Sequence, residues 1–223
     1  MVAQFIEAQF MTAQFIVPNM YYDITRPLTT RTAVFPGDTP VSINPVAQMS
    51  AGASCNVSAL TLSSHAATHI DAPRHYSDDA VGIQAISPEI FLGPARVVTI
   101  MSPYIQRTDL EQHNLAGVHR LIIHTRASTI PNDVWEADFA YFDPAAANYL
   151  GELGVRLIGT DAPSVDPATS KSLPAHKTFL HHNIIIMENL NLTGVLDGDY
   201  ELIALPLSIV DCDAAPARAI LRN

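Results

Sequence analysis

The stretch HAATHIDAPRH, residues 65–75, places three histidines and one aspartate within a short segment of the chain. All four side chains occupy odd-numbered positions: His65, His69, Asp71 and His75. In an extended chain, successive side chains alternate between two faces, so residues two apart share a face. We therefore expect an extended segment that gathers the three imidazoles and the carboxylate on one side, at least until Pro73 bends the chain.

A helix fits this stretch poorly. Thr68 and Ile70 are β-branched, which makes them weak helix formers. Pro73 also disfavours helical geometry at the residue before it, Ala72. In the extended alternative, Ala67 lies on the same side as the histidines, and its methyl group is predicted to project toward them.

Imidazole and carboxylate groups are the common protein ligands of zinc, manganese and related ions. One aspartate, with two oxygens, can bridge two such ions. The alternatives are a polar network in the core, or surface histidines that lie together by chance. Four convergent groups in one short stretch favour a metal site over both alternatives.

A second segment is needed, because one strand rarely encloses a metal ion by itself. The best candidate is AHKTFLHHNIIIMEN, residues 175–189, in which Glu188 follows an apolar run. A buried carboxylate needs a partner, and a metal ion provides one; the alternative is an exposed strand end. His176, His181 and His182 lie upstream. His181 and His182 are adjacent and would face opposite ways in a strand, so both cannot easily serve one site.

The composition excludes several classes of partner. The chain has 223 residues, of which 48% are apolar and 15% charged, as expected for a folded globular protein. Its 22 acidic and 12 basic residues give a net charge of −10. Such an acidic surface disfavours nucleic acids and anionic membranes as partners, and small molecules or other proteins are expected instead.

Targeting features and cysteine usage point to the cytoplasm. No apolar stretch near the N-terminus resembles a signal peptide or a membrane span. Cys55 and Cys212 are distant in sequence and lack C-x-x-C spacing, so we expect two buried thiols in a reducing compartment. A thiolate zinc site is excluded by this number of cysteines.

Periodicity predicts one strand-rich α/β domain over residues 20–223. Residues 1–19 are predicted to be an N-terminal extension, because AQF recurs every five residues there and fits neither a helix nor a strand. An alanine-rich helix is expected over residues 144–153. Apolar or alternating strands are expected at residues 22–25, 41–44, 56–63, 95–100, 120–125, 155–160, 183–187 and 201–205.

The histidine stretch resembles the signature H-x-G-T-H-x-D-x-P-x-H of the metal-dependent cyclase-like hydrolases. Four further segments extend the likeness to the kynurenine formamidase (arylformamidase) branch of this family. They are FPGDTPV (35–41), LGPARVV (92–98), GVRLIGTDAPSVDP (154–167) and DGDYELIALPL (197–207). The resemblance covers roughly residues 21–222. It implies a swivelling β/β/α domain, a homodimer, and hydrolysis of N-formyl-L-kynurenine to kynurenine and formate in tryptophan breakdown.

The resemblance also assigns roles to particular residues. It implies a binuclear metal site, usually of zinc, although manganese suits such ligands too. The implied metal ligands are His65, His69, Asp71, His176 and Glu188. His75 matches the acid–base residue of the family.

Two positions depart from the family pattern. Ala67 stands where the family has glycine, which bears on the shape of the substrate site and on the backbone conformation there. Phe35 stands where tryptophan is frequent, and it would form either an aromatic wall for an aryl substrate or a packing anchor for its loop.

Two other functions are compatible with these residues. The chain could hydrolyse another amide, an isatin-like lactam or a carbamate. It could also bind metal without catalysis, but a mixed set of histidine and carboxylate ligands with a spare histidine is typical of an open catalytic site. A substrate screen with and without a chelator separates these functions.

Overall fold

The computed structural model describes residues 20–223. The AQF repeat and the predicted extension over residues 1–19 lie outside the described residues. Within the described part, a mixed α/β, strand-rich domain agrees with the fold class expected from the sequence.

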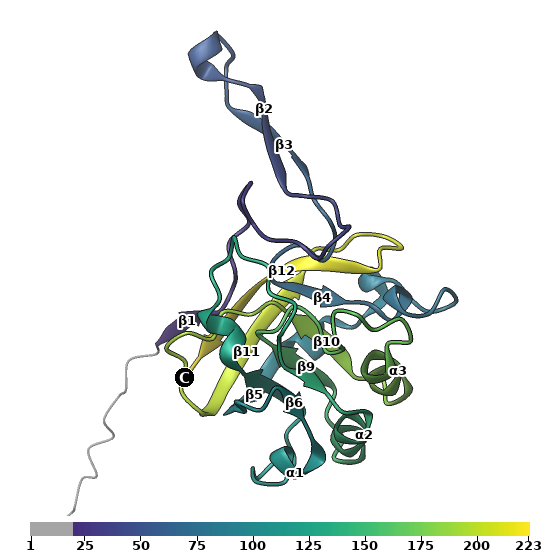
Figure 1. The fold of residues 1–223 in the computed structure, drawn as a ribbon. Coiled ribbons are helices and arrows are strands. Elements are labelled where there is room, and N and C mark those ends of the chain that lie inside the picture. Colours follow the sequence, from purple (N-terminus) through teal and green to yellow (C-terminus); the bar gives the residue numbers. More distant parts are fainter. Residues whose placement is uncertain (1–19) are drawn as a thin grey trace, which may run out of the picture.

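A barrel-like sheet forms the body of the domain (Figure 1). Seven strands follow one another around it, and the first and last of them, β12 and β4, also pair, which closes the ring. An eighth strand, β1 (Tyr21–Asp23), adds to the outer edge of β12. The order around the ring is β12 (Ala214–Arg222), β11 (Gly198–Pro206), β5 (Leu92–Thr99), β7 (Arg120–His124), β9 (Leu157–Thr160), β10 (Ile185–Glu188) and β4 (His69–Asp71).

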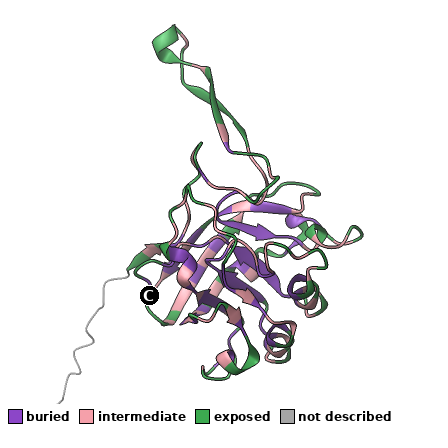
Figure 2. Ribbon diagram, viewed as in Figure 1, coloured by how far each residue is buried: buried purple, intermediate pink, exposed green. Residues whose placement is uncertain are grey.

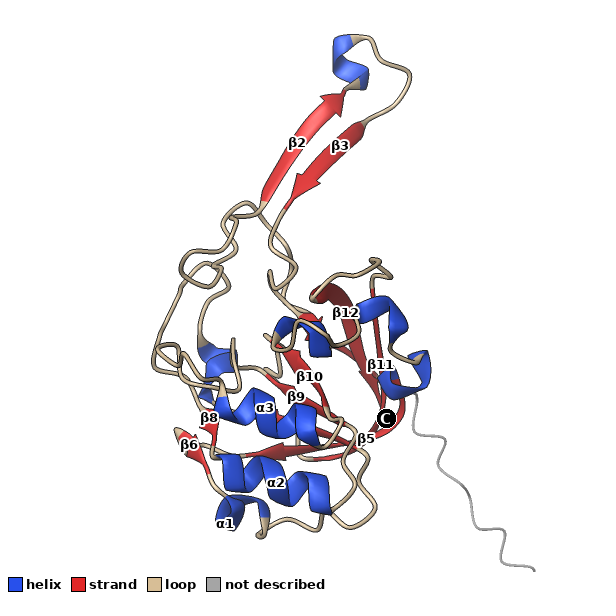
Figure 3. Cartoon of the chain, turned by 90° about the vertical axis from the view of Figure 1, so that its right-hand side faces the viewer, coloured by secondary structure: helices blue, strands red, loops and turns tan. Residues whose placement is uncertain are grey.

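Three helices cover one outer face of this sheet (Figures 1 and 3). They are α1 (Arg107–Leu110), α2 (Pro144–Glu152) and α3 (Pro174–His181). A small parallel pair, β6 (Tyr104–Ile105) and β8 (Tyr141–Phe142), also occurs. The short 3-10 helices are η1 (Met49–Ala51), η2 (Pro73–His75), η3 (Ile83–Ala85), η4 (Pro88–Phe91) and η5 (Arg126–Thr129).

Alternation along the central strands divides the buried side chains between two cores. On β7, Ile122 belongs to the core shared with β11 and β12, whereas Leu121 and Ile123 pack with the helices. The strands β5, β7, β9 and β10 are parallel to one another, and both of their faces are covered. Strands buried on both faces read as continuous apolar runs, which explains sequences such as RLIIH and NIIIM.

A long hairpin leaves the body of the domain. Its strands, β2 (Ser42–Ala47) and β3 (Val57–Thr61), pair antiparallel and project away from the barrel (Figure 1). Most of this hairpin is exposed (Figure 2). Cys55 lies there and is exposed, and Cys212 is half-buried. The expectation of two buried thiols was therefore wrong, because the segment around Cys55 contributes nothing to either core.

The structure corrects the expected geometry of the histidine stretch. Only His69–Asp71 is a strand, and residues 64–68 form turns and bends. Ala67 has a φ of +56°, in the left-handed region, so alternation cannot run from His65 to His69. Residues 174–181 form a helix, so the strand geometry considered for His181 and His182 does not apply. Among residues 20–223, no helix is long and apolar enough to cross a membrane.

Candidate metal centre and active site

The register of the sheet brings His69 and Glu188 together. These residues are direct partners across the antiparallel pair of β4 and β10. Facing residues on such a pair carry neighbouring side chains. His69 Nε2 lies 3.4 Å from Glu188 Oε2, and both side chains are buried. Two residues further along β4, Asp71 is completely buried, with its Oδ1 3.3 Å from His69 Nε2.

His176 reaches the same point from the first turn of α3. The carboxylate of Asp166 accepts hydrogen bonds from the backbone N–H groups of Ala175 and His176. It also lies 2.7 Å from His176 Nδ1, which fixes the orientation of the ring. The other ring nitrogen, Nε2, lies 3.6 Å from Asp71 Oδ2 and 3.7 Å from Glu188 Oε1.

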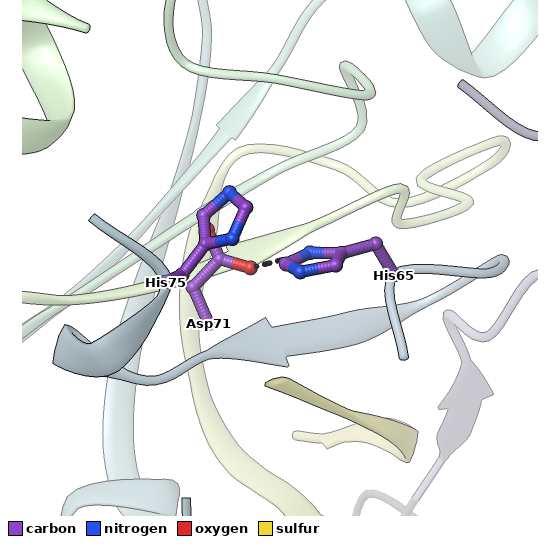
Figure 4. A group of neighbouring side chains, drawn as sticks. All are labelled: His65, Asp71 and His75. Carbon is purple, nitrogen blue, oxygen red and sulfur yellow. Dashed lines mark ion pairs between the residues drawn. The ribbon is translucent and has the colours of Figure 1, made fainter. Parts of the chain in front are cut away.

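His65 and His75 both lie next to the carboxylate of Asp71 (Figure 4), and they are the more exposed histidines of the cluster. His65 Nδ1 is 3.0 Å from Asp71 Oδ1, and the ring centroids of the two histidines are 4.1 Å apart. The His75 side chain is 31% exposed and that of His65 is 16% exposed. Together with Asp71, these histidines place possible ligand atoms within 4.8 Å of one another.

The donor set fits divalent metal ions. His69 Nε2 and both carboxylate oxygens of Asp71 are buried and have no hydrogen-bond partner among the described residues. Unpartnered buried polar atoms are costly, and a bound cation satisfies them. A tetrahedral zinc site with bonds of about 2.0–2.2 Å sets neighbouring ligand atoms about 3.3–3.6 Å apart. The distances of 3.0–3.7 Å around Asp71 are close to that range.

The cluster concentrates charge in the absence of an ion. Burial by itself lowers the pKa of each buried histidine, but the carboxylates around them outweigh it. They raise the pKa of His69 to about 9, of His176 to about 10 and of His65 to about 11. Burial alone would raise the pKa of Asp71, but the histidines around it hold that pKa well below its usual value. A metal ion would replace these protons as the positive charge.

His75 differs electrostatically from the other three histidines. Burial lowers its pKa, and the neighbouring charges do not reverse that shift. Its neutral form is therefore favoured near neutral pH, whereas the other three rings hold protons when no ion is bound. A neutral imidazole at the open side of the cluster can accept a proton.

A cavity of about 270 Å³ opens above the cluster. His65, His69, His75, His176 and Glu188 contribute to its wall. Phe35 and Trp135 lie on another part of the wall, edge to face, with ring centroids 4.9 Å apart. Ala67 also lines the cavity. The arrangement can therefore hold an aromatic molecule next to a metal centre.

The structure thus brings together all six of the predicted metal and acid–base residues, and Phe35 borders the same cavity. Glu188 is buried, which rules out the alternative of an exposed strand end. His182 contacts Asn148 of α2 rather than the cluster, and His181 does not line the cavity.

Three residues next to the cluster or its cavity were not predicted from the sequence. Asp166 lies inside the segment GVRLIGTDAPSVDP, but it precedes the first residue of α3, Pro174, by eight positions, so no local capping pattern marked it. Trp135 carried no signal beyond being the single tryptophan of the chain. Asp213 pairs with His65 across 148 positions of sequence, which no local pattern reveals.

Comparison with known proteins identifies relatives along most of the chain. Residues 22–167 match the family model described as "Putative cyclase". A curated kynurenine formamidase from Bacillus mycoides (strain KBAB4) is 40% identical over 205 residues, covering 92% of this chain and 98% of that one. The kynurenine formamidase of Geobacillus thermodenitrificans (strain NG80-2) is 43% identical over 206 residues, with the same coverage of 92% and 98%.

Solved structures share the architecture. One is a potential metal-dependent hydrolase with cyclase activity, with a TM-score of 0.81 at 26% identity, covering 92% of this chain and 98% of that one. An isatin hydrolase bound to the product analogue thioisatinate gives a TM-score of 0.77, covering 92% of each chain. At 19% identity, this second likeness shows the fold alone. With a family model matching most of its length and relatives at 40% identity or more, the chain belongs to the cyclase family of metal-dependent hydrolases.

Proposed function

We propose that this protein is a metal-dependent amide hydrolase that converts N-formyl-L-kynurenine and water to L-kynurenine and formate, a step of tryptophan breakdown. One observation carries the proposal: a buried His/Asp/Glu cluster with unpartnered ligand atoms opens into a cavity walled by two aromatic rings. The kynurenine formamidases that are 40% and 43% identical support the choice of substrate.

The metal centre is proposed to hold two divalent ions, most simply zinc. Asp71 lies between both sets of ligands, with Oδ1 toward His65 and His69 and Oδ2 toward His176. It would therefore bridge the two ions, while Glu188 faces both His69 and His176. When bound, such ions activate a water molecule near neutral pH and polarise the formyl oxygen.

The residues of the chain then supply positioning and proton transfer. Phe35 and Trp135 would hold the aryl ring, and the formyl group would face the cluster. His75 would take a proton as water adds to the formyl carbon. It would then give that proton to the aniline nitrogen as the C–N bond breaks, because an unprotonated aniline nitrogen is a poor leaving group.

Charged groups at the cavity suit the amino-acid end of this substrate. Lys171 lines the cavity and makes no ion pair or hydrogen bond with another residue in the described part of the chain. Asp38 also lines it, and its carboxylate accepts a hydrogen bond from Ser63 Oγ. The other lining cation, Arg26, donates to the carbonyl oxygens of three residues: Ala127, Ile130 and Leu190. Lys171 is thus the cation left for a substrate carboxylate.

The activity test compares N-formyl-L-kynurenine, formanilide and isatin, with and without a chelator. We expect formate release from N-formyl-L-kynurenine that the chelator abolishes and added zinc restores. Turnover of isatin alone would transfer the assignment to a lactam hydrolase. No turnover of any amide by protein that binds metal would contradict the enzymatic proposal.

Lys171 offers a sharper test, because the chain has only one other lysine, Lys177. Lys171→Met should raise KM for N-formyl-L-kynurenine by about tenfold, the loss of a charge-assisted hydrogen bond. KM for formanilide, which has no carboxylate, should not change. Lys177→Met is the matched control, because Lys177 is exposed on α3 and does not line the cavity. Equal effects on both substrates would refute the role of Lys171.

The hairpin supports the proposal of a homodimer. A two-stranded hairpin is marginal by itself in water, and this one exposes large apolar side chains: Ile43, Val46, Met49, Val57 and Leu60. Packing against a second copy of the chain would cover them. Light scattering should give the mass of a dimer for the full chain. A double change, Val46→Asp with Leu60→Asp, should give the mass of a monomer.

The remaining assignments are proposals of the same kind. A cytoplasmic location suits two free cysteines, which persist as thiols in a reducing compartment. The swivelling β/β/α type is proposed from the sequence resemblance.

A further inference from the structure

Asp213 lies just before β12 and reaches two histidines of the cluster with one oxygen. Its Oδ2 is 3.0 Å from His65 Nε2 and 3.6 Å from His75 Nδ1. Its other oxygen, Oδ1, accepts a hydrogen bond of 2.9 Å from Ser64 Oγ. The backbone carbonyl of Asp213 accepts from the N–H of Ala72, which anchors the residue beside the histidine stretch.

The two ring nitrogens of His65 face different carboxylates. Nδ1 faces Asp71, and Nε2 faces Asp213. With a metal ion on the Asp71 side of the ring, the single proton of a neutral His65 belongs on Nε2, because the ionised carboxylate of Asp213 there only accepts hydrogen bonds. Nδ1 then has a free electron pair directed toward Asp71 and the proposed metal position. Carboxylate partners of this kind orient metal-ligating histidines and select their tautomer.

We infer that Asp213 is a positioning residue that holds His65 ready to bind metal and keeps His75 beside it. The inference rests on the proposed metal centre. It adds a residue that ligates no ion and does not line the cavity, and that acts through the rings of His65 and His75.

The backbone near His65 makes such a support necessary. His69 belongs to a strand and His176 to a helix, whereas His65 lies in a turn. Its ring is less buried than those of His69 and His176. With less packing around it, the ring depends more on its hydrogen bond for orientation. His69 and His176 have comparable partners in the Ala67 carbonyl oxygen, at 2.9 Å, and in Asp166.

The test is Asp213→Asn, with Asp211→Asn as the matched control. Asp213 has a 43% exposed side chain, so its replacement leaves no cavity in the core. Asp211 is two residues away on the same loop and contacts Gln84 rather than the histidines. Both variants keep the size of the side chain and remove one negative charge, so a general charge effect would appear in both.

Zinc affinity is measured by competition with a chromophoric chelator. The visible absorption spectrum of the cobalt-loaded protein reports the coordination of the bound ion. Asp213→Asn should weaken the binding of one zinc ion by about 10–100-fold and alter the cobalt spectrum. It should also lower kcat more than it raises KM. Asp211→Asn should match the unaltered protein in all three measurements.

A second variant covers the case in which Asp213→Asn fails to fold. Ser64→Ala removes the hydrogen bond that steadies Asp213 and should weaken zinc binding by about fivefold, the value of one hydrogen bond. Unchanged zinc affinity and an unchanged cobalt spectrum in the folded variants would overturn the inference. Absence of zinc binding by the unaltered protein would instead refute the proposed metal centre.

Discussion

The cluster has two halves that differ in burial. The buried half consists of His69, Asp71, His176 and Glu188, each no more than 3% exposed. The open half consists of His65, His75 and Asp213, whose side chains are 16%, 31% and 43% exposed. The buried half is built on β4, β10 and α3, whereas the open half lies in a turn, a 3-10 helix and the loop before β12.

This difference distinguishes the groups that only hold a metal from the half that also faces the substrate. Groups on packed strands and helices have fixed positions, which suits permanent ligands. Groups that solvent reaches can exchange protons and meet a substrate. We therefore expect changes in the buried half to remove metal, changes at His65 and Asp213 to weaken the binding of one metal ion, and a change at His75 to affect turnover without loss of metal.

The largest effect is expected for Asp71→Ala, which removes the buried carboxylate that also contacts His65 of the open half. The remaining histidines and Glu188 no longer share a bridging carboxylate, so at least one metal ion per subunit should be lost. Elemental analysis after dialysis measures this directly, and turnover should fall below detection. Full metal content would contradict the bridging role. Asp78→Ala serves as a control, because Asp78 belongs to neither half.

The next effect is expected for His75→Ala. Turnover should fall by about 10²–10⁴-fold, the usual contribution of general acid–base catalysis. Metal content should stay the same, because the five proposed ligands remain. This result would separate the two halves most clearly, since His75 lies close enough to Asp71 and His65 to act as a ligand. Loss of a metal ion would assign His75 to ligation instead. His181→Ala, outside the cavity, should have no effect.

The histidines of the buried half should make the stability of the folded protein depend on pH in one direction without metal and in the opposite direction with metal bound. Folding raises the pKa values of His69 and His176 to about 9 and about 10. Their protonated forms therefore stabilise the metal-free protein fully below pH 6.5, and this stabilisation is lost as the pH rises through those values. Bound metal requires the neutral rings, so it stabilises more at higher pH.

Melting temperatures of chelator-treated and zinc-loaded protein test this at about pH 6 and about pH 9. The gap between the two temperatures should widen as the pH rises. A gap that narrows would show that the metal does not replace protons on these histidines.

The smallest effect is expected where the two halves join, at Ala67. A left-handed backbone costs an L-residue about 1–2 kcal/mol, and a glycine loses about 0.5–1 kcal/mol more backbone entropy than alanine on folding. Ala67→Gly should therefore leave stability unchanged or raise it by up to about 1.5 kcal/mol. Ala66→Gly is the matched control. Ala66 is fully buried and is not among the residues with positive φ, so it should lose stability. Denaturant unfolding measures the free energy of unfolding of both variants. A clear loss of stability in Ala67→Gly would show that the backbone of Ala67 is not strained.

Much of the cluster was visible in the sequence because its proposed ligands occur in two short segments. The spacing of His65, His69, Asp71 and His75 predicted convergence, and the apolar run before Glu188 predicted a carboxylate that needs a partner. The expected extended geometry was wrong between His65 and His69, where Ala67 adopts a left-handed backbone. The residues still converge, because the turn over residues 64–68 brings His65 next to Asp71.

The fold was predictable at the level of strands and less so at the level of their order. The apolar strands over residues 95–100, 120–125 and 155–160 were expected, and the helix at 144–153 was found at Pro144–Glu152. Strand β12 was missed, because AAPARAILR is rich in alanine and contains a proline, so its pattern is weak. Without β12, closure of the ring against β4 could not be inferred.

The sequence by itself determined the chemistry: which side chains are present, the short spacings that group them, and the family to which they belong. Only the tertiary structure decided which distant groups support them. The pairing of β4 with β10 places Glu188 beside His69, and the pairing of β4 with β12 brings Asp213 to His65. Such contacts depend on the register of strands far apart in the chain, and local periodicity contains no information about that register.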